Sequence, residues 1–274
     1  MSSWNRNVSQ KKKQPPSTTL VIAHNSGFFS CCSVRLDRII QYFNKNRILP
    51  LIVDSSAQFE WYKPLRSHKA SIVDTYFITD PSGILFQGPV NYEQWYQFTD
   101  YKKLNFTAIQ PFIIKYFSPS QQIQEIVSNL ETKYSLDYSN LCVLFYRGND
   151  KAKETELSSY DDYITKAKSI QQENPSIQFL LQSDETDFFE AIFEEFPKAI
   201  CFKDEIRHIK KSNTTVDDIF KEDNYHFSKY FLAITLCMAK CKYIVCGSGN
   251  CSIWIALYRG NTEGMYQHLH DKWI

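Results

Sequence analysis

The sequence predicts an α/β fold built from doubly wound parallel sheets. Short apolar segments recur along the 274 residues, and several end in small or polar residues that lead into a helical pattern. Such short apolar runs are typical of the interior strands of parallel sheets, which are buried on both faces. Because strand and helix alternate in this way in both halves of the chain, we expect two α/β units.

The first unit begins with an apolar strand over 18–23, which continues into His24-Asn-Ser-Gly27. Around Val34–Phe43 the apolar side chains follow helical spacing. A second strand is predicted over Ile48–Val53, ending at Asp54. The order of strand, glycine-containing turn, helix and strand is that of half a doubly wound unit.

A helix over 119–133 is predicted to join the two halves, with Ser118 or Ser120 as its N-cap. The first residues, with lysines at 11–13, form a short polar tail. The chain is therefore divided into a polar tail (1–16), an N-terminal α/β domain (17–135) and a C-terminal α/β domain (136–274).

The second unit contains a strand over Leu141–Tyr146 that is followed at once by Arg147. Ligands bind at the carboxyl ends of the strands of α/β sheets, so this guanidinium lies where a ligand is expected. Its planar fork can donate two charge-assisted hydrogen bonds to a diphosphate. Asp150 could orient Arg147, cap the next segment or face water.

An amphipathic helix over Tyr160–Ile170 comes next, with Tyr163 and Ala167 on its apolar face. A third strand, over Ile177–Gln182, ends in Ser183-Asp184-Glu185 and is followed by an acidic helix. Strand and helix thus continue to alternate, as in a doubly wound sheet.

A charged stretch over Lys203–Asp223 shows little periodicity and is expected to form a loop. It could be a mobile strap close to the ligand. Arg207 and His208 within it could reach a phosphate, although exposure to solvent is the ordinary state of such residues.

The last third of the chain predicts a helix with apolar residues at Phe227, Phe231, Ile234 and Met238, and then a buried strand over Tyr243–Cys246. This strand leads through a small polar turn into a second helix. The N-terminus of a helix attracts phosphate, because its backbone N–H groups have no partner and carry partial positive charge.

Two glycines in this turn, Gly247 and Gly249, would let Ser248 and Asn250 approach a ligand closely. Asn250 or Ser252 could cap the helix that follows. A strand–glycine–helix junction can also be a simple turn with no ligand. The turn and Arg147 together favour a phosphate site more than either does alone.

Four blocks of the sequence carry a family resemblance. They are Tyr146–Lys151, the helix that begins Tyr160-Asp-Asp-Tyr163, Phe179–Glu185, and Met238–Trp254. In this order the blocks resemble the donor-binding, C-terminal half of the fucosyltransferase superfamily, and they are most similar to the α-1,2-fucosyltransferases. The resemblance covers about half of the chain.

The resemblance implies a GT-B-like fold, with two doubly wound, Rossmann-type domains facing a cleft. It implies a glycosyltransferase that moves a sugar, fucose among the candidates, from a nucleotide-diphosphate donor to a hydroxyl of a glycan acceptor. The transfer would be inverting and metal-independent, with a GDP-type donor favoured and no cofactor. The donor-binding residues would be Arg147, Asp150, Asp184, Ser248, Gly249, Asn250 and Ser252.

Two departures from the family pattern concern the diphosphate site. Phe145 stands where the family has a histidine before its arginine, and the paired-arginine pattern is reduced to Arg147 alone, with Gly148 next to it. The donor could therefore be a nucleotide sugar other than GDP-fucose. The alternative is a catalytically inactive nucleotide- or sugar-binding relative of the same fold.

In the superfamily the first loop of the N-terminal half faces the donor across the cleft, so His24, Asn25 and Gly27 are expected to line it. His24, Asp54 and Glu60 are candidates for the general base that activates the acceptor, and spacing does not choose among them. Nearby aromatic residues could stack on sugar rings or form core, and core is favoured. They are Phe59, Trp61, Tyr62, Tyr92, Trp95, Tyr96 and Tyr101.

Composition narrows the function classes. The net charge is +1, so no general field for nucleic acid exists, and no apolar run is long enough to span a membrane. Without a signal-like stretch, we expect a soluble, cytoplasmic protein. The eight cysteines fit a reducing compartment, and the absence of a Cys-x-x-Cys pair argues against a metal site. A dinucleotide fingerprint is missing after the first strand, which argues against a dehydrogenase.

Overall fold

The structure is a computed structural model that describes residues 18–64, 71–80 and 83–274. Its largest sheet lies in the C-terminal half and has the strand order β10-β9-β8-β5-β6-β7. All neighbouring strands are parallel except β10, which is antiparallel to β9. The strands are β5 (Leu141–Tyr146), β6 (Gln178–Ser183), β7 (Ile200–Cys201), β8 (Tyr243–Cys246), β9 (Met265–Leu269) and β10 (Lys272–Trp273).

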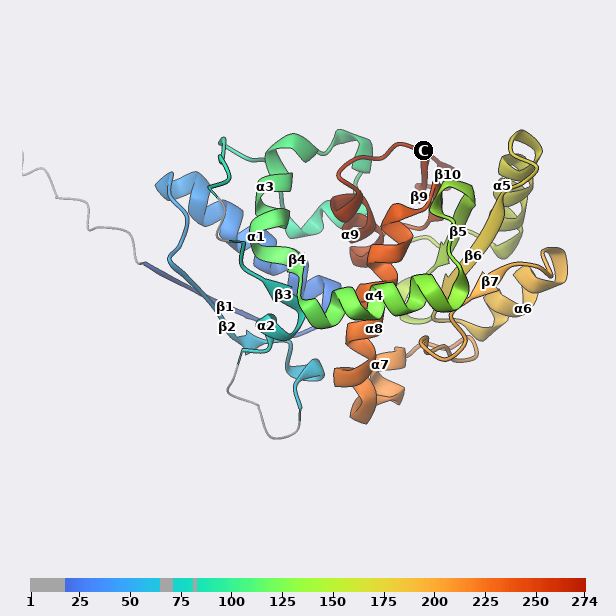
Figure 1. The fold of residues 1–274 in the computed structure, drawn as a ribbon, viewed down its shortest axis with the longest axis horizontal. Helices are drawn as coiled ribbons and strands as arrows, with labels where there is room; N and C mark the ends of the chain where they lie inside the picture. Colours follow the sequence, from blue (N-terminus) through green and yellow to red (C-terminus); the bar gives the residue numbers. More distant parts are fainter. Residues whose placement is uncertain (1–17, 65–70, 81–82) are drawn as a thin grey trace, which may run out of the picture.

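Helices cover both faces of this sheet, so the predicted doubly wound arrangement is confirmed in the C-terminal half (Figure 1). Along β5, Val143 and Phe145 belong to the core shared with α8 (Asn224–Lys240) and α9 (Asn250–Arg259). The alternate residues belong to a second core, shared with α5 (Tyr160–Glu173) and α6 (Thr186–Glu195). Burial on both faces explains why the strands are continuous apolar runs in the sequence.

The N-terminal half holds a smaller sheet than its pattern suggests. There, β1 (Thr19–His24) pairs in parallel with β2 (Ile52–Gln58), and α1 (Phe28–Asn46) connects them. The predicted second strand over Ile48–Val53 starts four residues later than expected. Pro50 precedes it and has no N–H to donate to a ladder. Asp54 consequently lies inside a strand and not at its end.

Short elements and two helices complete the N-terminal half. Of the two predicted caps of the joining helix, Ser120 is the N-cap, because its side chain accepts the N–H of Ile123. The elements are α2 (Val73–Tyr76), β3 (Phe77–Ile78), α3 (Phe106–Phe117), β4 (Ser118–Pro119) and α4 (Gln121–Tyr134), with β3 and β4 antiparallel.

A single hydrophobic cluster extends through both halves of the chain. Figure 1 shows α4, α8 and α9 between the β1–β2 sheet at one end of the molecule and α5 and α6 at the other. Trp254 of α9 is fully buried there, with its ring centroid 4.7 Å from that of Phe117 and 6.0 Å from that of Phe29. The predicted domain boundary between 135 and 136 falls after α4 and remains a prediction.

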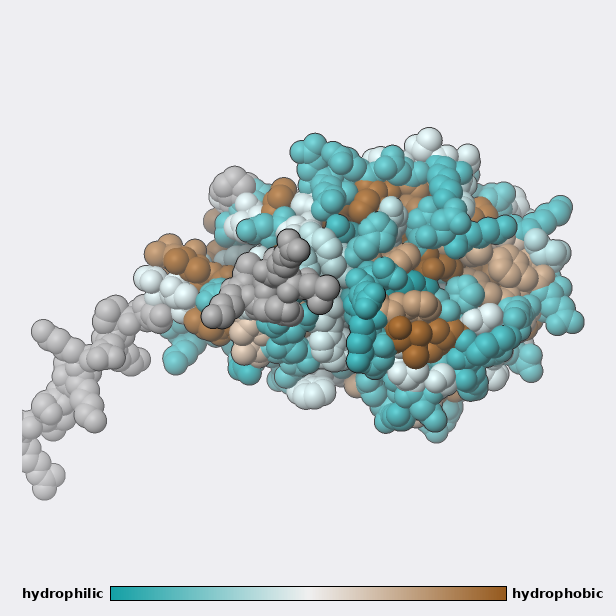
Figure 2. Space-filling view, turned by 90° about the horizontal axis from the view of Figure 1, so that it is seen from below, coloured by the Kyte–Doolittle hydropathy of each residue, from teal (hydrophilic) through white to brown (hydrophobic). Residues whose placement is uncertain are grey.

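The face shown in Figure 2 is mostly polar, with apolar patches both at the end of the molecule that carries β1 and β2 and in the other half. Val21, Leu51 and Ile52 are exposed at the end that carries β1 and β2. Within the described ranges, no helix has the length and apolar character needed to cross a bilayer. The predicted polar tail, 1–16, lies outside the described residues.

Candidate active site in the cleft between the two halves

A cleft of about 360 Å³ is lined by residues of both halves of the chain. The N-terminal half contributes the loop after β1, and the C-terminal half contributes the segments that follow β5 and β8. The cleft therefore lies at the carboxyl ends of β5 and β8, which are parallel neighbours in the large sheet, where α/β sheets bind ligands. Of the predicted site residues, it brings together His24, Gly27, Arg147, Asp150, Ser248, Gly249, Asn250 and Ser252.

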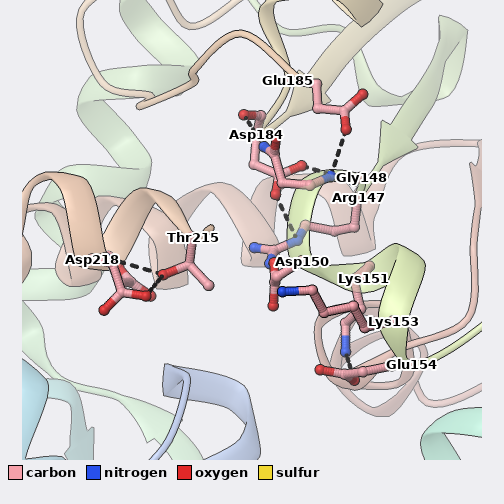
Figure 3. A network of polar contacts seen from close by, with 12 residues as sticks. Arg147, Gly148, Asp150, Lys151, Lys153, Glu154, Asp184, Glu185, Thr215 and Asp218 are labelled. Atoms are coloured by element: carbon pink, nitrogen blue, oxygen red, sulfur yellow. Dashed lines mark hydrogen bonds and ion pairs between the residues drawn. The ribbon is translucent and has the colours of Figure 1, made fainter. Parts of the chain in front are cut away.

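Arg147 is held between two carboxylates as it leaves β5 (Figure 3). Its Nε lies 3.3 Å from Asp184 Oδ2, and its Nη2 donates to Asp150 Oδ1 at 3.2 Å. Burial alone would lower the pKa of Arg147, but Asp184, Asp150 and Asp217 raise it, so the guanidinium stays charged. Its side chain is 24% exposed, and Nη1 makes no hydrogen bond to the described residues. This nitrogen is available to a ligand.

Two buried carboxylates, Asp184 and Glu185, accept hydrogen bonds from the turn after β5. Asp184 Oδ1 accepts the N–H of Gly148 at 2.9 Å, and Glu185, which is fully buried, accepts the N–H of Asn149 and the hydroxyl of Tyr160. A Cβ at position 148 would lie 2.0 Å from Glu185 Oε1. The chain therefore has no room for a side chain, and hence for a second arginine, at this position.

We expect Gly148→Ala to lower the free energy of unfolding by about 2 kcal/mol, because the buried Glu185 carboxylate must move and its hydrogen bonds to the turn are strained. Urea unfolding measures this loss. The matched control is Gly83→Ala, since a Cβ there meets no atom within 4 Å. Equal stability of the two variants would show that Glu185 does not enforce the glycine.

Lys151 is a second cation of the cleft, which the sequence interpretation did not select. It is almost fully buried, its Nζ forms an ion pair with Glu154, and it lies 5.6 Å from the centroid of the Phe98 ring. A Cβ at Gly249 would lie 3.4 Å from Lys151 Cε, so this side chain reaches the turn after β8. Lys151 lies four residues after Arg147, in a 3₁₀ helix, η5 (Asn149–Lys153), so its closeness in sequence to Arg147 was the signal that could have found it.

The turn after β8 leads into α9, and the residue that caps this helix is not one of the two predicted. The N-cap of α9 is Gly249, with φ 157°, and no side chain caps the helix, so neither Asn250 nor Ser252 has that role. Asn250 Oδ1 instead accepts the Ser33 hydroxyl at 2.8 Å. The first N–H groups of α9 consequently have no side-chain acceptor, and the residues that carry them line the cleft. A bound anion would complete this helix end.

The hydroxyl of Ser248 is already occupied. It donates to the carbonyl of His268 at 2.7 Å and accepts from Gln267 at 2.9 Å. Tyr101 of the N-terminal half fixes the next residue, because its hydroxyl accepts the N–H of Gly249 at 3.1 Å. These bonds hold the turn in place, so a ligand in the cleft would meet its backbone N–H groups and not the Ser248 hydroxyl.

The three predicted base candidates occupy different places. His24 lines the cleft, where its Nε2 lies 2.9 Å from Ser30 Oγ, and burial lowers its pKa. Asp54 accepts the N–H of Ser56, and this bond lowers the pKa of a carboxylate that is not part of the cleft. Glu60 forms an ion pair with Lys63 at 2.6 Å, also outside the cleft.

Asn25 was expected in the cleft but does not line it. Its side chain donates to the carbonyl of Ala57 at 3.2 Å and accepts the N–H of Glu60 at 3.0 Å. It therefore holds the end of β2 and the residues just after it against the loop after β1.

A smaller cavity of about 50 Å³ also borders Arg147 and is lined by Phe145, Asp184 and Arg207 among others. Arg207 forms an ion pair with Asp217 at 2.7 Å, so part of the predicted strap does come close to Arg147. This segment contains α7 (Val216–Ile219) and is less irregular than predicted. His208 points elsewhere, bonded to the hydroxyl of Thr186.

No protein-family model matches the chain, and no curated protein matches it. Among solved structures, it is similar to NodZ alpha-1,6-fucosyltransferase in a crystal soaked with GDP-fucose, with a TM-score of 0.57 and 9% sequence identity. The match covers 94% of this chain and 97% of that one. The fold is fucosyltransferase-like.

The predicted GT-B-like α/β fold is therefore confirmed, over nearly the whole chain and not only the half that carried the resemblance. The α-1,2 subtype receives no specific support, because the neighbour is an alpha-1,6 enzyme. With 9% identity the likeness concerns the fold, and function has to be argued from the cleft.

Proposed function

We propose that the protein is a glycosyltransferase that moves a sugar from a nucleoside-diphosphate donor to a hydroxyl of a glycan acceptor. The observation that carries the proposal is the meeting of Arg147, Lys151 and the uncapped N-terminus of α9 in one cleft. A GDP-type donor with fucose is the first candidate, because the similar structure was soaked with GDP-fucose. The earlier resemblance favours the same donor.

These three groups would act on the leaving group. When the acceptor oxygen attacks the anomeric carbon, the bond from that carbon to the β-phosphate oxygen breaks and negative charge grows on the diphosphate. Positive charge fixed in place before the reaction stabilises this transition state most effectively. Arg147 is fixed by Asp184 and Asp150, and α9 by Tyr101 and Ser33. We propose that this charge replaces a metal ion and that a single displacement inverts the anomeric centre.

The proton of the acceptor hydroxyl needs a base, and His24 is the predicted candidate that lines the cleft. Because burial lowers its pKa, its ring is neutral at pH 7 and can accept a proton. Asp150 is a second candidate. It lines the same cleft, and burial raises its pKa, as suits a carboxylate base.

If His24 is the base, kcat/KM should fall as the pH drops through its pKa, which lies below the usual value of about 6.5. Above that pH the profile should be level, since the neutral ring predominates. His24→Ala should lose about 10²–10⁴-fold in kcat/KM, together with this acidic limb. Ser30→Ala is the control for the loss of the hydrogen bond alone. An unchanged limb in His24→Ala would assign it to another group, with Asp150 next in line.

The alternative is a binding protein of the same fold without catalysis. Phe145 favours it, because this side chain is buried beside Arg147 and cannot donate a hydrogen bond as the family histidine does. The test is incubation with GDP-fucose and related nucleotide sugars, with a panel of glycans, followed by mass spectrometry of the glycans and measurement of released nucleotide. A glycan that gains one sugar supports the transferase. Donor binding without turnover on any glycan would favour the alternative.

A further inference from the structure

The predicted aromatic cluster divides into two groups. Most of its members are buried, but Trp61 is 43% exposed and Trp95 is 64% exposed, and both line the cleft that contains Arg147. Single exposed hydrophobic residues are common on protein surfaces. Two indoles on one cleft are a different matter, since tryptophan exposes a large apolar ring and is enriched at binding sites. The buried members are Phe59, Tyr62, Tyr92 and Tyr101.

Gln97, on the same N-terminal side of the cleft, has a side-chain oxygen without a hydrogen-bond partner among the described residues. It lies two residues after Trp95 in a 3₁₀ helix, η2 (Gln94–Phe98), is only 6% exposed and lines the cleft. Its Oε1 is buried and has no hydrogen-bond partner. Buried amide oxygens in proteins are nearly always bonded, so the Gln97 amide has hydrogen-bonding capacity that the described residues leave unused.

The position of Gln97 is fixed relative to the phosphate-binding turn. Its backbone carbonyl accepts the Tyr101 hydroxyl at 2.8 Å, and the same hydroxyl accepts the N–H of Gly249 at 3.1 Å. Trp61, Trp95 and the Gln97 amide therefore line the N-terminal side of the cleft, next to the groups proposed to hold the diphosphate.

We infer that Trp61, Trp95 and Gln97 form the subsite for a neutral sugar ring of the acceptor. An indole face packs against the C–H face of a pyranose, and the side-chain amide of Gln97, which can donate or accept, hydrogen-bonds a ring hydroxyl. This inference rests on the proposed function, because it names the acceptor for the same cleft.

The polar groups nearby favour a sugar over a second charged ligand. His24, Ser26 and Ser30 on this side of the cleft are uncharged hydrogen-bonding residues that suit hydroxyl groups, and His24 is neutral at pH 7 because burial lowers its pKa. The cations of the cleft, Arg147 and Lys151, come from the C-terminal half. A nucleobase could also stack on an indole, and the experiment separates the two.

The experiment measures the binding of neutral di- and trisaccharides of glucose, galactose, mannose and N-acetylglucosamine, by saturation-transfer NMR and by titration. The protein is the full chain, as wild type and as Trp61→Ala, Trp95→Ala, Trp95→Phe and Gln97→Leu. GDP binding is measured in parallel on each variant. Leu85→Ala, at a side chain that is exposed away from the cleft, is the matched control.

We expect wild type and Leu85→Ala to bind at least one saccharide, and each tryptophan-to-alanine variant to lose about tenfold or more in affinity. Trp95→Phe should retain most of the binding, and Gln97→Leu should weaken it, while GDP binding stays unchanged in all variants. Saccharide binding without GDP binding would refute the donor proposal and leave this subsite standing. GDP binding with no saccharide bound, or with saccharide binding indifferent to both tryptophans, would overturn the subsite. Loss of GDP affinity in the tryptophan variants would assign the indoles to the nucleobase.

Discussion

Arg147→Ala is expected to weaken GDP binding by on the order of a hundredfold while the protein stays folded. The wild-type guanidinium is oriented by Asp184 and Asp150 and has one nitrogen free for a phosphate oxygen. Without it, the two carboxylates remain beside the site and repel the diphosphate, so the loss exceeds that of one hydrogen bond. Isothermal titration with GDP measures the effect, and transfer activity should fall with it.

Arg147→Lys is the matched variant, because it keeps the positive charge and removes the planar fork. We expect it to bind GDP with an affinity between those of wild type and Arg147→Ala. Thermal unfolding of each variant checks that the fold is retained. Full GDP affinity in folded Arg147→Ala would show that the diphosphate is bound elsewhere.

Trp254→Ala should lower the free energy of unfolding by about 3–5 kcal/mol, as expected when a fully buried indole is truncated. Trp254 belongs to the C-terminal half, yet its ring packs on Phe29 and Phe117 of the N-terminal half. Its Nε1 donates to Ser33 Oγ at 2.9 Å, and Ser33 in turn bonds Asn250 at the start of α9. Loss of this side chain should therefore destabilise both the core and the phosphate-binding turn, as measured by urea unfolding and by GDP affinity.

Two milder variants separate packing from hydrogen bonding. Trp254→Phe keeps much of the ring and loses the bond to Ser33, and Ser33→Ala loses the bonds to both Trp254 and Asn250. Each should cost about 1 kcal/mol, well below the alanine variant. A loss in Trp254→Ala no larger than in Ser33→Ala would mean that the two halves do not depend on this contact.

The C-terminal half could be predicted closely because its strands are buried on both faces. The strands at Leu141–Tyr146 and Tyr243–Cys246 match the structure to the residue. In contrast, α3 was missed because Pro111 lies inside it, where proline normally opposes a helix. The C-terminal pair β9 and β10 was also missed, since its mixed sequence has no continuous apolar run.

The candidate site could be predicted only where local sequence determines it. Arg147 and the turn before α9 could be located because the sequence shows where β5 and β8 end and where α9 begins. Lys151 and Gln97 acquire their roles from contacts between distant segments. Lys151 reaches Gly249, and Tyr101, which bonds the carbonyl of Gln97, also bonds Gly249. The choice of His24 over Asp54 and Glu60 also needed the structure, since all three lie near strand ends in the sequence.

The most direct test of the central claim is a thermal-shift measurement of wild type and Arg147→Ala with GDP, GDP-fucose and the corresponding UDP compounds. A ligand that binds only the folded protein, at a hundred times its dissociation constant, adds about 2.7 kcal/mol of stability. We predict stabilisation of wild type by GDP and GDP-fucose that Arg147→Ala loses. Stabilisation by the UDP compounds instead would replace the donor and keep the site. If no nucleotide stabilises the wild type, the claim that this cleft binds a nucleotide-sugar donor is wrong.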